Sequence, residues 1–317
     1  MESLADRCAV TGASGYVGSR VAEYFETRNW TVFEFTRRPG SRLSPGRVNV
    51  PFQLDSHIDP TAFRDNGIRV VVHCAYDFHP LNWDEIYRIN VEGSAKLLRA
   101  AKEAGVDRII LISSISAFEG CSSLYGKAKL EIEKVAASLG AFIVRSGLVY
   151  GSRPSGGMFG ALQRSVGKST IIPLIGSGRY MQYLVHEDDL CGLLLKLSSE
   201  ETKLPAGPII AASSRGWSIR DLLQAMAAAR RTRVKFVPLP WRAVWLGLRI
   251  SELLGIAVPF RSDSVISLVR QNLNPDFLLA NQLGYRFREF DGSFVDSPAA
   301  GLPKASNSDP HKSVQIC

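Results

Sequence analysis

Cysteine is scarce in this sequence, and its few cysteines form no recognisable pattern. The 317 residues include five, at Cys8, Cys74, Cys121, Cys191 and Cys317. They are odd in number, widely separated and without a C-x-x-C pair, which argues against a disulfide framework and a zinc site. We therefore expect a reduced, cytoplasmic protein without a bound metal.

Long apolar runs and dense charge runs are also absent. No uninterrupted stretch of about 18 apolar residues occurs, and the nearest, Trp241–Val258, is broken by Arg242, Arg249 and Glu252. The net charge is +8, but the basic residues are dispersed along the chain. We expect neither a membrane-spanning segment nor nucleic acid as a partner, but a small-molecule substrate. The sequence is compatible with a homodimer.

What the sequence does contain is an alternation of short β-branched runs and helical patterns. Such alternation predicts a doubly wound parallel sheet of the Rossmann type, an α/β fold. Strands are expected at Arg7–Thr11, Trp30–Thr36, Val70–Ala75, Arg108–Ser113, Ala141–Leu148 and Pro208–Ala212. Helices are expected at Gly15–Thr27, Glu85–Ala104, Leu124–Leu139 and Ser218–Arg230.

The composition changes along the chain and divides it into three parts. Residues 1–155 are the expected dinucleotide-binding domain, and residues 156–291 a smaller C-terminal substrate lobe that returns to the core. Residues 292–317 lack periodicity and are expected to be a disordered tail. Trp241–Val258 predicts an amphipathic helix that packs on the main domain, covers a hydrophobic substrate or touches a membrane.

A glycine-rich segment lies where the first expected strand meets the first helix. In Thr11-Gly12-Ala13-Ser14-Gly15-Tyr16-Val17-Gly18 the glycines permit a tight turn, close approach to a pyrophosphate and close helix packing. The helix N-terminus presents N–H groups and a partial positive charge to phosphates. The residues expected to bind a nicotinamide dinucleotide are Gly12, Ser14, Gly15, Tyr16, Val17 and Gly18.

The end of the second expected strand indicates which dinucleotide is bound. NAD enzymes normally place a carboxylate there for the ribose 2′-hydroxyl, whereas an arginine can pair with the 2′-phosphate of NADP. Thr36 occupies the acid position, and Arg37 and Arg38 follow it. We predict NADP as the preferred cofactor and NAD as the alternative, in which the arginines only solvate the strand end. Asp55 is expected to accept a hydrogen bond from the adenine amino group.

Tyr125 and Lys129 are spaced i and i+4, so they share one face of the expected helix. A phenol, with a pKa of about 10, is a poor base at neutral pH, and a neighbouring ammonium lowers that pKa. The preceding strand delivers Ser113 and Ser114 at the edge where ligands bind in such sheets. A serine hydroxyl there can bind a substrate oxygen. The pattern predicts hydride transfer at a carbonyl or secondary alcohol.

Together these motifs resemble the extended short-chain dehydrogenases/reductases of the NAD-dependent epimerase/dehydratase family. The similarity covers roughly residues 7–200, through TGASGYVG, Asp55, VVHCA at 71–75, NVEGSAKLL at 90–98, SSIS at 113–116, YGKAK at 125–129, RSGLVYG at 145–151 and VHEDDL at 185–190. The resemblance implies a catalytic triad of Ser114, Tyr125 and Lys129.

The same resemblance implies further roles at the cofactor end of the site. Cys74 and Ala75 would line the adenosine side, and Asn90 would organise this end. Ser146 and Leu148 would lie beneath the nicotinamide. Asp189 would link the two lobes.

Three departures from the family pattern concern the substrate. Only ten residues separate Ser114 from Tyr125, which shortens the wall that contacts the hexose in sugar-nucleotide members. Gln182 replaces the arginine that binds the nucleotide diphosphate, with Arg179 as a possible substitute. The Thr-Asp-Glu trio of the 4,6-dehydratases is absent, which disfavours dehydration. Ser116 stays open as the alternative working serine.

The sequence thus predicts an NAD(P)-dependent reductase or epimerase of a ketone or secondary alcohol. A nucleotide-linked keto-sugar is the substrate that the family implies, and a lipid-like or aromatic ketone is the alternative. The competing class is a non-catalytic dinucleotide-binding protein with a structural or regulatory role. The joint presence of Ser114, Tyr125 and Lys129 argues against that class.

Overall fold

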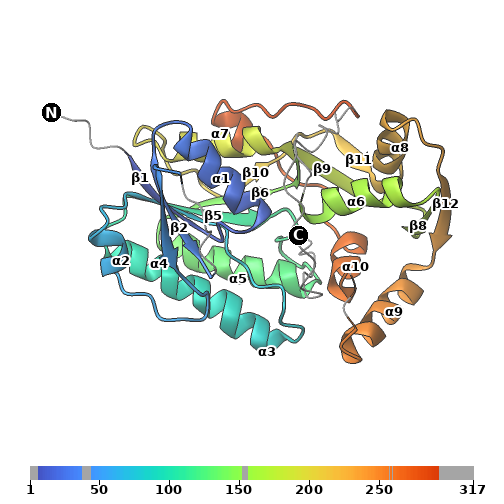
Figure 1. Cartoon of the computed structure of the whole chain (residues 1–317), viewed down its shortest axis with the longest axis horizontal. Coiled ribbons are helices and arrows are strands. Elements are labelled where there is room, and N and C mark those ends of the chain that lie inside the picture. Colours follow the sequence, from blue (N-terminus) through green and yellow to red (C-terminus); the bar gives the residue numbers. More distant parts are fainter. Residues whose placement is uncertain (1–5, 38–43, 152–155, 257, 259, 293–317) are drawn as a thin grey trace.

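The computed structural model describes residues 6–37, 44–151, 156–256, 258 and 260–292. A large region is built on a parallel sheet, and a smaller region lies beside one end of it (Figure 1). The expected tail from residue 293 onward lies outside the described residues.

The sheet of the large region has seven strands in the order β10-β6-β5-β4-β1-β2-β3. All neighbouring pairs are parallel. The strands are β1 (Arg7–Thr11), β2 (Thr31–Thr36), β3 (Arg47–Pro51), β4 (Val70–His73), β5 (Arg108–Ser114), β6 (Phe142–Ser146) and β10 (Ile209–Ala211). The order reverses between β1 and β4, which confirms the doubly wound fold and places the ligand crevice beyond the carboxyl ends of these strands.

Helices cover both faces of this sheet (Figure 1). One face carries α1 (Tyr16–Glu26), α7 (Glu187–Leu197) and α11 (Leu278–Gln282), and the other carries α2 (Thr61–Arg64), α3 (Trp83–Ile86), α4 (Gly93–Glu103) and α5 (Leu124–Ser138). In β1, the side chains of Cys8 and Val10 belong to the hydrophobic core on the α1 face, and that of Ala9 belongs to the core on the α5 face. Because successive strand residues point to opposite faces, a continuous apolar strand supplies both cores.

The large region differs from the expectation in several elements, since helices α2, α7 and α11 were not predicted. The edge strand β3 was not predicted, because its residues are only partly buried and carry no apolar run. The expected helix Glu85–Ala104 starts earlier, at Trp83, and contains a π-helical segment η1 (Tyr87–Glu92). Single π-helical turns are frequent at functional sites.

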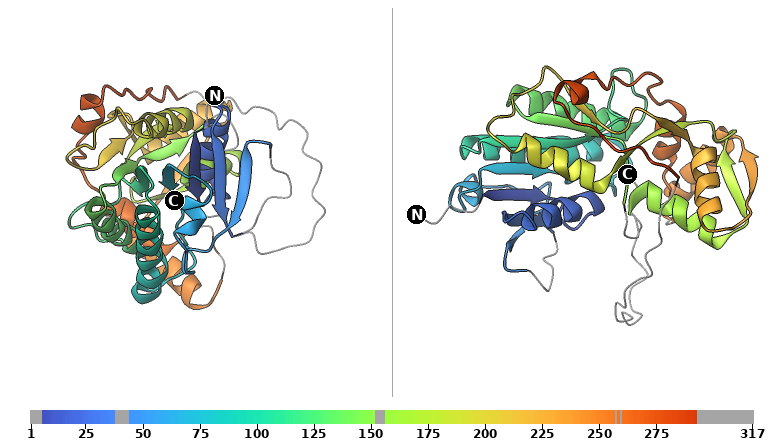
Figure 2. Two further views of the ribbon diagram at one scale, coloured as in Figure 1. Left: turned by 90° about the vertical axis from the view of Figure 1, so that its left-hand side faces the viewer. Right: turned by 90° about the horizontal axis from the view of Figure 1, so that it is seen from above.

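The smaller region combines four helices with two small sheets (Figure 2). Its helices are α6 (Gly157–Lys168), α8 (Ile219–Ala229), α9 (Trp241–Leu253) and α10 (Ser262–Val269). Its strands are β7 (Leu148–Tyr150), β9 (Met181–His186) and β11 (Gly216–Ser218) in one sheet, and β8 (Ile171–Ile175) and β12 (Lys235–Leu239) in the other. The chain passes back through α7 and β10 into the large region.

Two expected elements of this half have different bounds. The expected strand Ala141–Leu148 is divided at Gly147 into β6 and β7. The helix expected over Trp241–Val258 ends at Leu253, and Gly255 follows with a φ of +68°. A glycine in this conformation typically terminates a helix. None of the described helices is long and apolar enough to cross a membrane.

His73 connects three elements inside the large region. Its fully buried ring lies 2.7 Å from the Thr11 hydroxyl through Nδ1 and 2.9 Å from the Ser94 hydroxyl through Nε2. Burial, and secondly the ammonium of Lys129, lower the pKa of His73 to about 3. The imidazole is therefore neutral at neutral pH.

This buried imidazole makes stability depend on pH. The unfolded histidine has a pKa of about 6.5, so between about pH 6.5 and about pH 3 the unfolded chain binds a proton that the folded chain does not. The buried neutral imidazole of His73 makes its full contribution to stability above about pH 6.5, and this contribution is lost as the pH falls towards about 3. Between about pH 6 and about pH 5, we expect wild type to lose up to about 1.4 kcal/mol more free energy of unfolding than His73→Gln. Urea titrations measure this, and parallel pH profiles would contradict it.

Candidate active site

Two adjoining cavities lie at the carboxyl edge of the sheet. The first, of about 250 Å³, extends from the glycine turn to the end of β5. The second, of about 390 Å³, lies between β5 and the smaller region. Residues that line both include Tyr76, Phe78, Ser114, Tyr125 and Leu148. Two of the three predicted catalytic residues therefore lie where the cavities meet, and Lys129 lines the first cavity.

The glycine turn has the geometry of a phosphate-binding site. Gly12 has a φ of +67°, and a Cβ there would lie 2.9 Å from the Cα of Ala75. A Cβ on Gly18 would lie 2.3 Å from the carbonyl oxygen of Gly12, so α1 packs directly on the turn. Among the described residues, no side chain caps the N-terminus of α1 at Gly15. All the predicted turn residues line the first cavity, and the open helix end fits a pyrophosphate.

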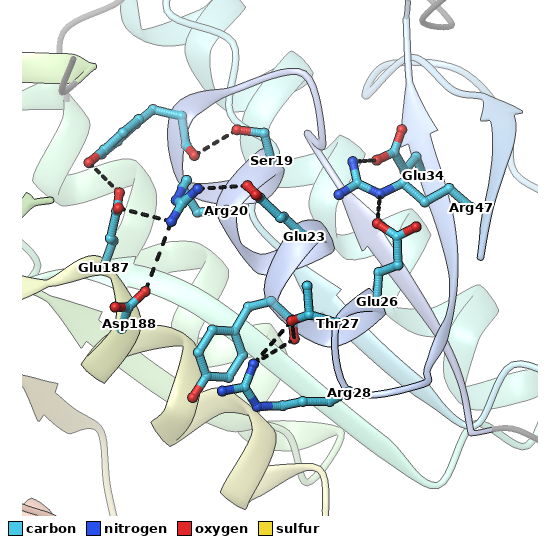
Figure 3. A network of polar contacts seen from close by, with 12 residues as sticks. Ser19, Arg20, Glu23, Glu26, Thr27, Arg28, Glu34, Arg47, Glu187 and Asp188 are labelled. Carbon is cyan, nitrogen blue, oxygen red and sulfur yellow. Dashed lines mark hydrogen bonds and ion pairs between the residues drawn. The ribbon is translucent and has the colours of Figure 1, made fainter. Parts of the chain in front are cut away.

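The first turn of α1 is held by the start of α7. Glu187 is buried; its Oε2 accepts a hydrogen bond from the Tyr16 hydroxyl at 2.8 Å, and its Oε1 lies 2.9 Å from Nη2 of Arg20. Figure 3 shows Arg20 between Glu187, Asp188 and Glu23. This network holds the glycine turn against the connection from β9 to α7.

The end of β2 lies at the other side of the first cavity. Thr36 is buried there, and Arg37 is half-exposed, with Nη1 3.6 Å from Oδ2 of Asp77. Both line the first cavity, as does Asp55, whose Oδ1 accepts a hydrogen bond from Gln53. The predicted Arg38 lies outside the described residues.

The ends of β1 and β4 are joined by hydrogen bonds beneath the same cavity. The Thr11 hydroxyl accepts from the backbone N–H groups of Cys74 and Ala75, at 3.1 and 3.2 Å, and both residues line the cavity. Asn90, in η1, is buried; its Oδ1 accepts from the N–H of Asp77 and its Nδ2 donates to the carbonyl of Asp77. Asn90 thus holds the loop that carries Asp77, the partner of Arg37.

Helix α5 presents Tyr125 at its first turn. The carboxylate of Asp263, from α10, accepts hydrogen bonds from the N–H groups of Leu124 (2.7 Å) and Tyr125 (3.0 Å). Burial raises the pKa of Asp263. A Cβ on Gly126 would lie 2.4 Å from the carbonyl oxygen of Ser116, so α5 packs tightly against the loop after β5. This contact brings Tyr125 to the same edge as Ser114.

The surroundings of Tyr125 are aromatic. Its ring packs edge-on against Tyr76, with centroids 5.0 Å apart, and stacks against Phe78, with centroids 5.6 Å apart. Lys129 is buried one helical turn further on; its Nζ donates to the carbonyl of Ile112 at 2.9 Å and lies 5.2 Å from the centroid of Tyr76. Sequence reasoning missed Tyr76 and Phe78, although they directly follow β4 at the ligand edge.

The serines after β5 have different partners. Ser113 is buried and donates to Oε1 of Glu133. The Ser114 hydroxyl accepts from the N–H of Ser116, whose own hydroxyl accepts from Ser267 of α10. Ser114 and Ser116 both line the two cavities, and Ser146 lines the first, opposite Ser114 in the sheet register.

The residues predicted to contact the substrate do not all line the cavities. Gln182 lines both cavities, whereas Arg179 is exposed and is not among the described residues that line either one. His186 also lies outside both linings; its Nδ1 accepts from the N–H of Asp188 at the start of α7. Asp189 accepts hydrogen bonds from Nε and Nη2 of Arg288 and so ties α7 to the segment after α11.

The chain belongs to the NAD dependent epimerase/dehydratase family, whose model matches residues 8–211. This confirms the family expected from the motifs and, at that level, a nicotinamide dinucleotide as the class of cofactor. The chain is similar to methionine adenosyltransferase 2 subunit beta of Pongo abelii, with 32% identity over 163 residues, 46% of this chain and 47% of that protein.

Two further similarities show the range of related proteins. Sterol-4-alpha-carboxylate 3-dehydrogenase, decarboxylating, of Homo sapiens is 33% identical over 126 residues, 38% of this chain and 32% of that protein. The structure of MoeE5 in complex with UDP-glucuronic acid and NAD superimposes with a TM-score of 0.64 at 21% identity, covering 74% of this chain and 85% of that one. The matched segments span less than half of these two curated relatives.

The glycine turn gives a direct test of the first cavity. In Gly12→Ala the added Cβ meets Ala75, and the left-handed backbone costs about 1–2 kcal/mol more for a residue with a side chain. We expect the dissociation constant for NADPH, measured by fluorescence titration, to rise by about tenfold or more. Gly247→Ala, on α9 with open space around its Cβ, is the matched control and should bind as wild type does. Unchanged binding by Gly12→Ala would exclude the turn as the cofactor site.

Proposed function

We propose that this protein transfers a hydride between a nicotinamide dinucleotide and a ketone or secondary alcohol. The observation that carries the proposal is that Tyr125 and Ser114 line both cavities. A cofactor in the first cavity and a substrate in the second would meet at these two hydroxyl groups. Reduction of a ketone is the simplest reaction for this arrangement, and epimerisation through a transient ketone is the variant that the family supports.

In this proposal the bound dinucleotide supplies or accepts the hydride at the substrate carbon. In the reductive direction the Tyr125 hydroxyl donates its proton to the substrate oxygen, and in the oxidative direction the phenolate accepts that proton. The Ser114 hydroxyl donates a hydrogen bond to the same oxygen and polarises it.

Lys129 supports this chemistry from its buried position on α5. Its ammonium stabilises the phenolate of Tyr125 electrostatically. It also lies in the lining of the first cavity, where it can donate hydrogen bonds to the nicotinamide ribose. Because the ammonium is buried and donates to the carbonyl of Ile112, it has few alternative positions.

We further propose that the preferred dinucleotide is NADP. Thr36 leaves the ribose 2′ position without a carboxylate at the end of β2, and Arg37 lies in the cavity lining beside it. The ion pair of Arg37 with Asp77 is long and half-exposed, so the guanidinium can turn to a 2′-phosphate at small cost.

A second candidate function is non-catalytic binding within a larger assembly. The observation that favours it is the similarity to a protein named as a subunit of methionine adenosyltransferase. In that case the first cavity would hold a dinucleotide, but Tyr125 would have no role in turnover.

Tyr125→Phe distinguishes the two candidates. The variant keeps the aromatic packing but loses the acid–base hydroxyl, so we expect turnover to fall by about 100-fold to 10,000-fold with NADPH affinity nearly unchanged. Tyr87→Phe, on an exposed residue of η1, is the matched control and should retain wild-type turnover. Full activity of Tyr125→Phe would refute the assigned role.

Cofactor preference is tested by Arg37→Glu. One charge-assisted hydrogen bond to a phosphate contributes about 1.5–3 kcal/mol, so wild type should bind NADPH more tightly than NADH by about tenfold or more. The variant should lose or invert that preference, as fluorescence titrations with both nucleotides would show. Arg99→Glu, at an exposed position of α4, should leave the ratio unchanged. Tighter binding of NADH by wild type would contradict the preference.

A further inference from the structure

Among the residues that the structure describes, the lining of the second cavity offers no uncompensated cation for a diphosphate. Its charged lining residues, among those that the structure describes, are Arg261 and Asp263, which carry opposite charges. The guanidinium of Arg261 donates to the carbonyl oxygens of Phe78 and Pro80. The carboxylate of Asp263 is engaged by the first turn of α5. A diphosphate buried here would lose hydration without gaining a counter-charge, which is strongly unfavourable.

Most of the wall of this cavity is instead formed by aliphatic and aromatic side chains. Each surrounding element of the smaller region contributes at least one, such as Leu162 from α6, Leu174 from β8, Leu223 from α8, Leu248 from α9 and Leu268 from α10. Apolar walls of this kind favour ligands that gain free energy by leaving water. Gln182, at the boundary with the first cavity, is one of the uncharged polar residues in the lining, as are Gln271 and Asn272.

Helix α9 forms the outer wall. Val244 and Leu248 line the cavity, while Leu246 and Ile250 are about half-exposed. None of its described residues is fully buried, so α9 does not pack as a core helix. It is tied to α10 through Glu252, whose carboxylate accepts from the N–H and hydroxyl of Ser262. Of the three roles predicted for this segment, covering a hydrophobic substrate agrees with these contacts.

We propose that the second cavity binds a neutral, predominantly apolar ketone or secondary alcohol, and that a nucleotide-linked sugar is not its substrate. The volume of about 390 Å³ lies in the range of small-molecule sites. The substrate oxygen reaches Tyr125 and Ser114 at the boundary of the two cavities, and the apolar body occupies the space between α6, α8 and α9. This inference rests on the proposed hydride transfer.

Binding is measured apart from turnover. The protein is saturated with NADP⁺, which cannot reduce a ketone, and titrated calorimetrically with decalone, tetralone and menthone, and separately with UDP-glucose. We expect at least one cyclic ketone to bind with a dissociation constant below about 1 mM and UDP-glucose to bind at least about tenfold more weakly. UDP-glucose binding more tightly than every ketone, or no ketone binding, overturns the inference.

A matched pair of variants on α9 locates the site. Leu248→Glu places a carboxylate in the cavity wall, whereas Leu246→Glu places the same group on the exposed side of the same helix. We expect Leu248→Glu to weaken ketone binding by about tenfold or more, because the charge must be desolvated, and to leave NADPH affinity unchanged. Leu246→Glu should bind ketone as wild type does. Equal effects of the two substitutions contradict the assignment.

The failure of this inference can be told from failure of the proposed function. If the ketones bind at the Leu248 site but wild type does not oxidise NADPH in their presence at any concentration, the substrate class stands and hydride transfer fails. If UDP-sugars bind and are converted in a reaction that Tyr125→Phe abolishes, hydride transfer stands and the apolar substrate fails.

Discussion

The carboxylate of Asp263 at the N-terminus of α5 is the contact on which the candidate site depends. It accepts two backbone hydrogen bonds at the first turn of the helix that carries Tyr125 and Lys129. A buried carboxylate is costly, and helix N–H groups and the positive end of the helix dipole offset part of that cost. Because Asp263 belongs to α10, the same contact joins the smaller region to the large one. The wall of the second cavity and the orientation of Tyr125 are therefore set together.

The parts of the structure that local sequence determines were predicted well. The glycine turn combines a strand, a positive φ at Gly12 and a helix start within a few residues, and each has a strong local signal. The spacing of Tyr125 and Lys129 on one helix face follows from helix geometry alone. The parallel order of the sheet follows from the alternation of buried strands and helices, and it is confirmed.

The parts that depend on contacts distant in sequence were not predicted. Asp263 and Arg261 lie more than a hundred residues from the groups that they bind, and no local pattern marks them. The sequence suggested Arg179 as a substitute for the diphosphate-binding arginine of the family, but Arg179 follows β8 at an exposed position. The apolar walls of the second cavity come from many separate elements, among them α6, β8, α8, α9 and α10, and each resembles ordinary core packing when taken alone.

The most direct test of this account is a crystal structure of the protein with NADP⁺ and an apolar secondary alcohol such as decalol. The account predicts the pyrophosphate at the N-terminus of α1 and the alcohol oxygen within hydrogen-bond distance of both the Tyr125 and Ser114 hydroxyls. The ring system should lie against Leu248 and Leu223. An alcohol bound away from Tyr125, or a dinucleotide bound outside the first cavity, would contradict it.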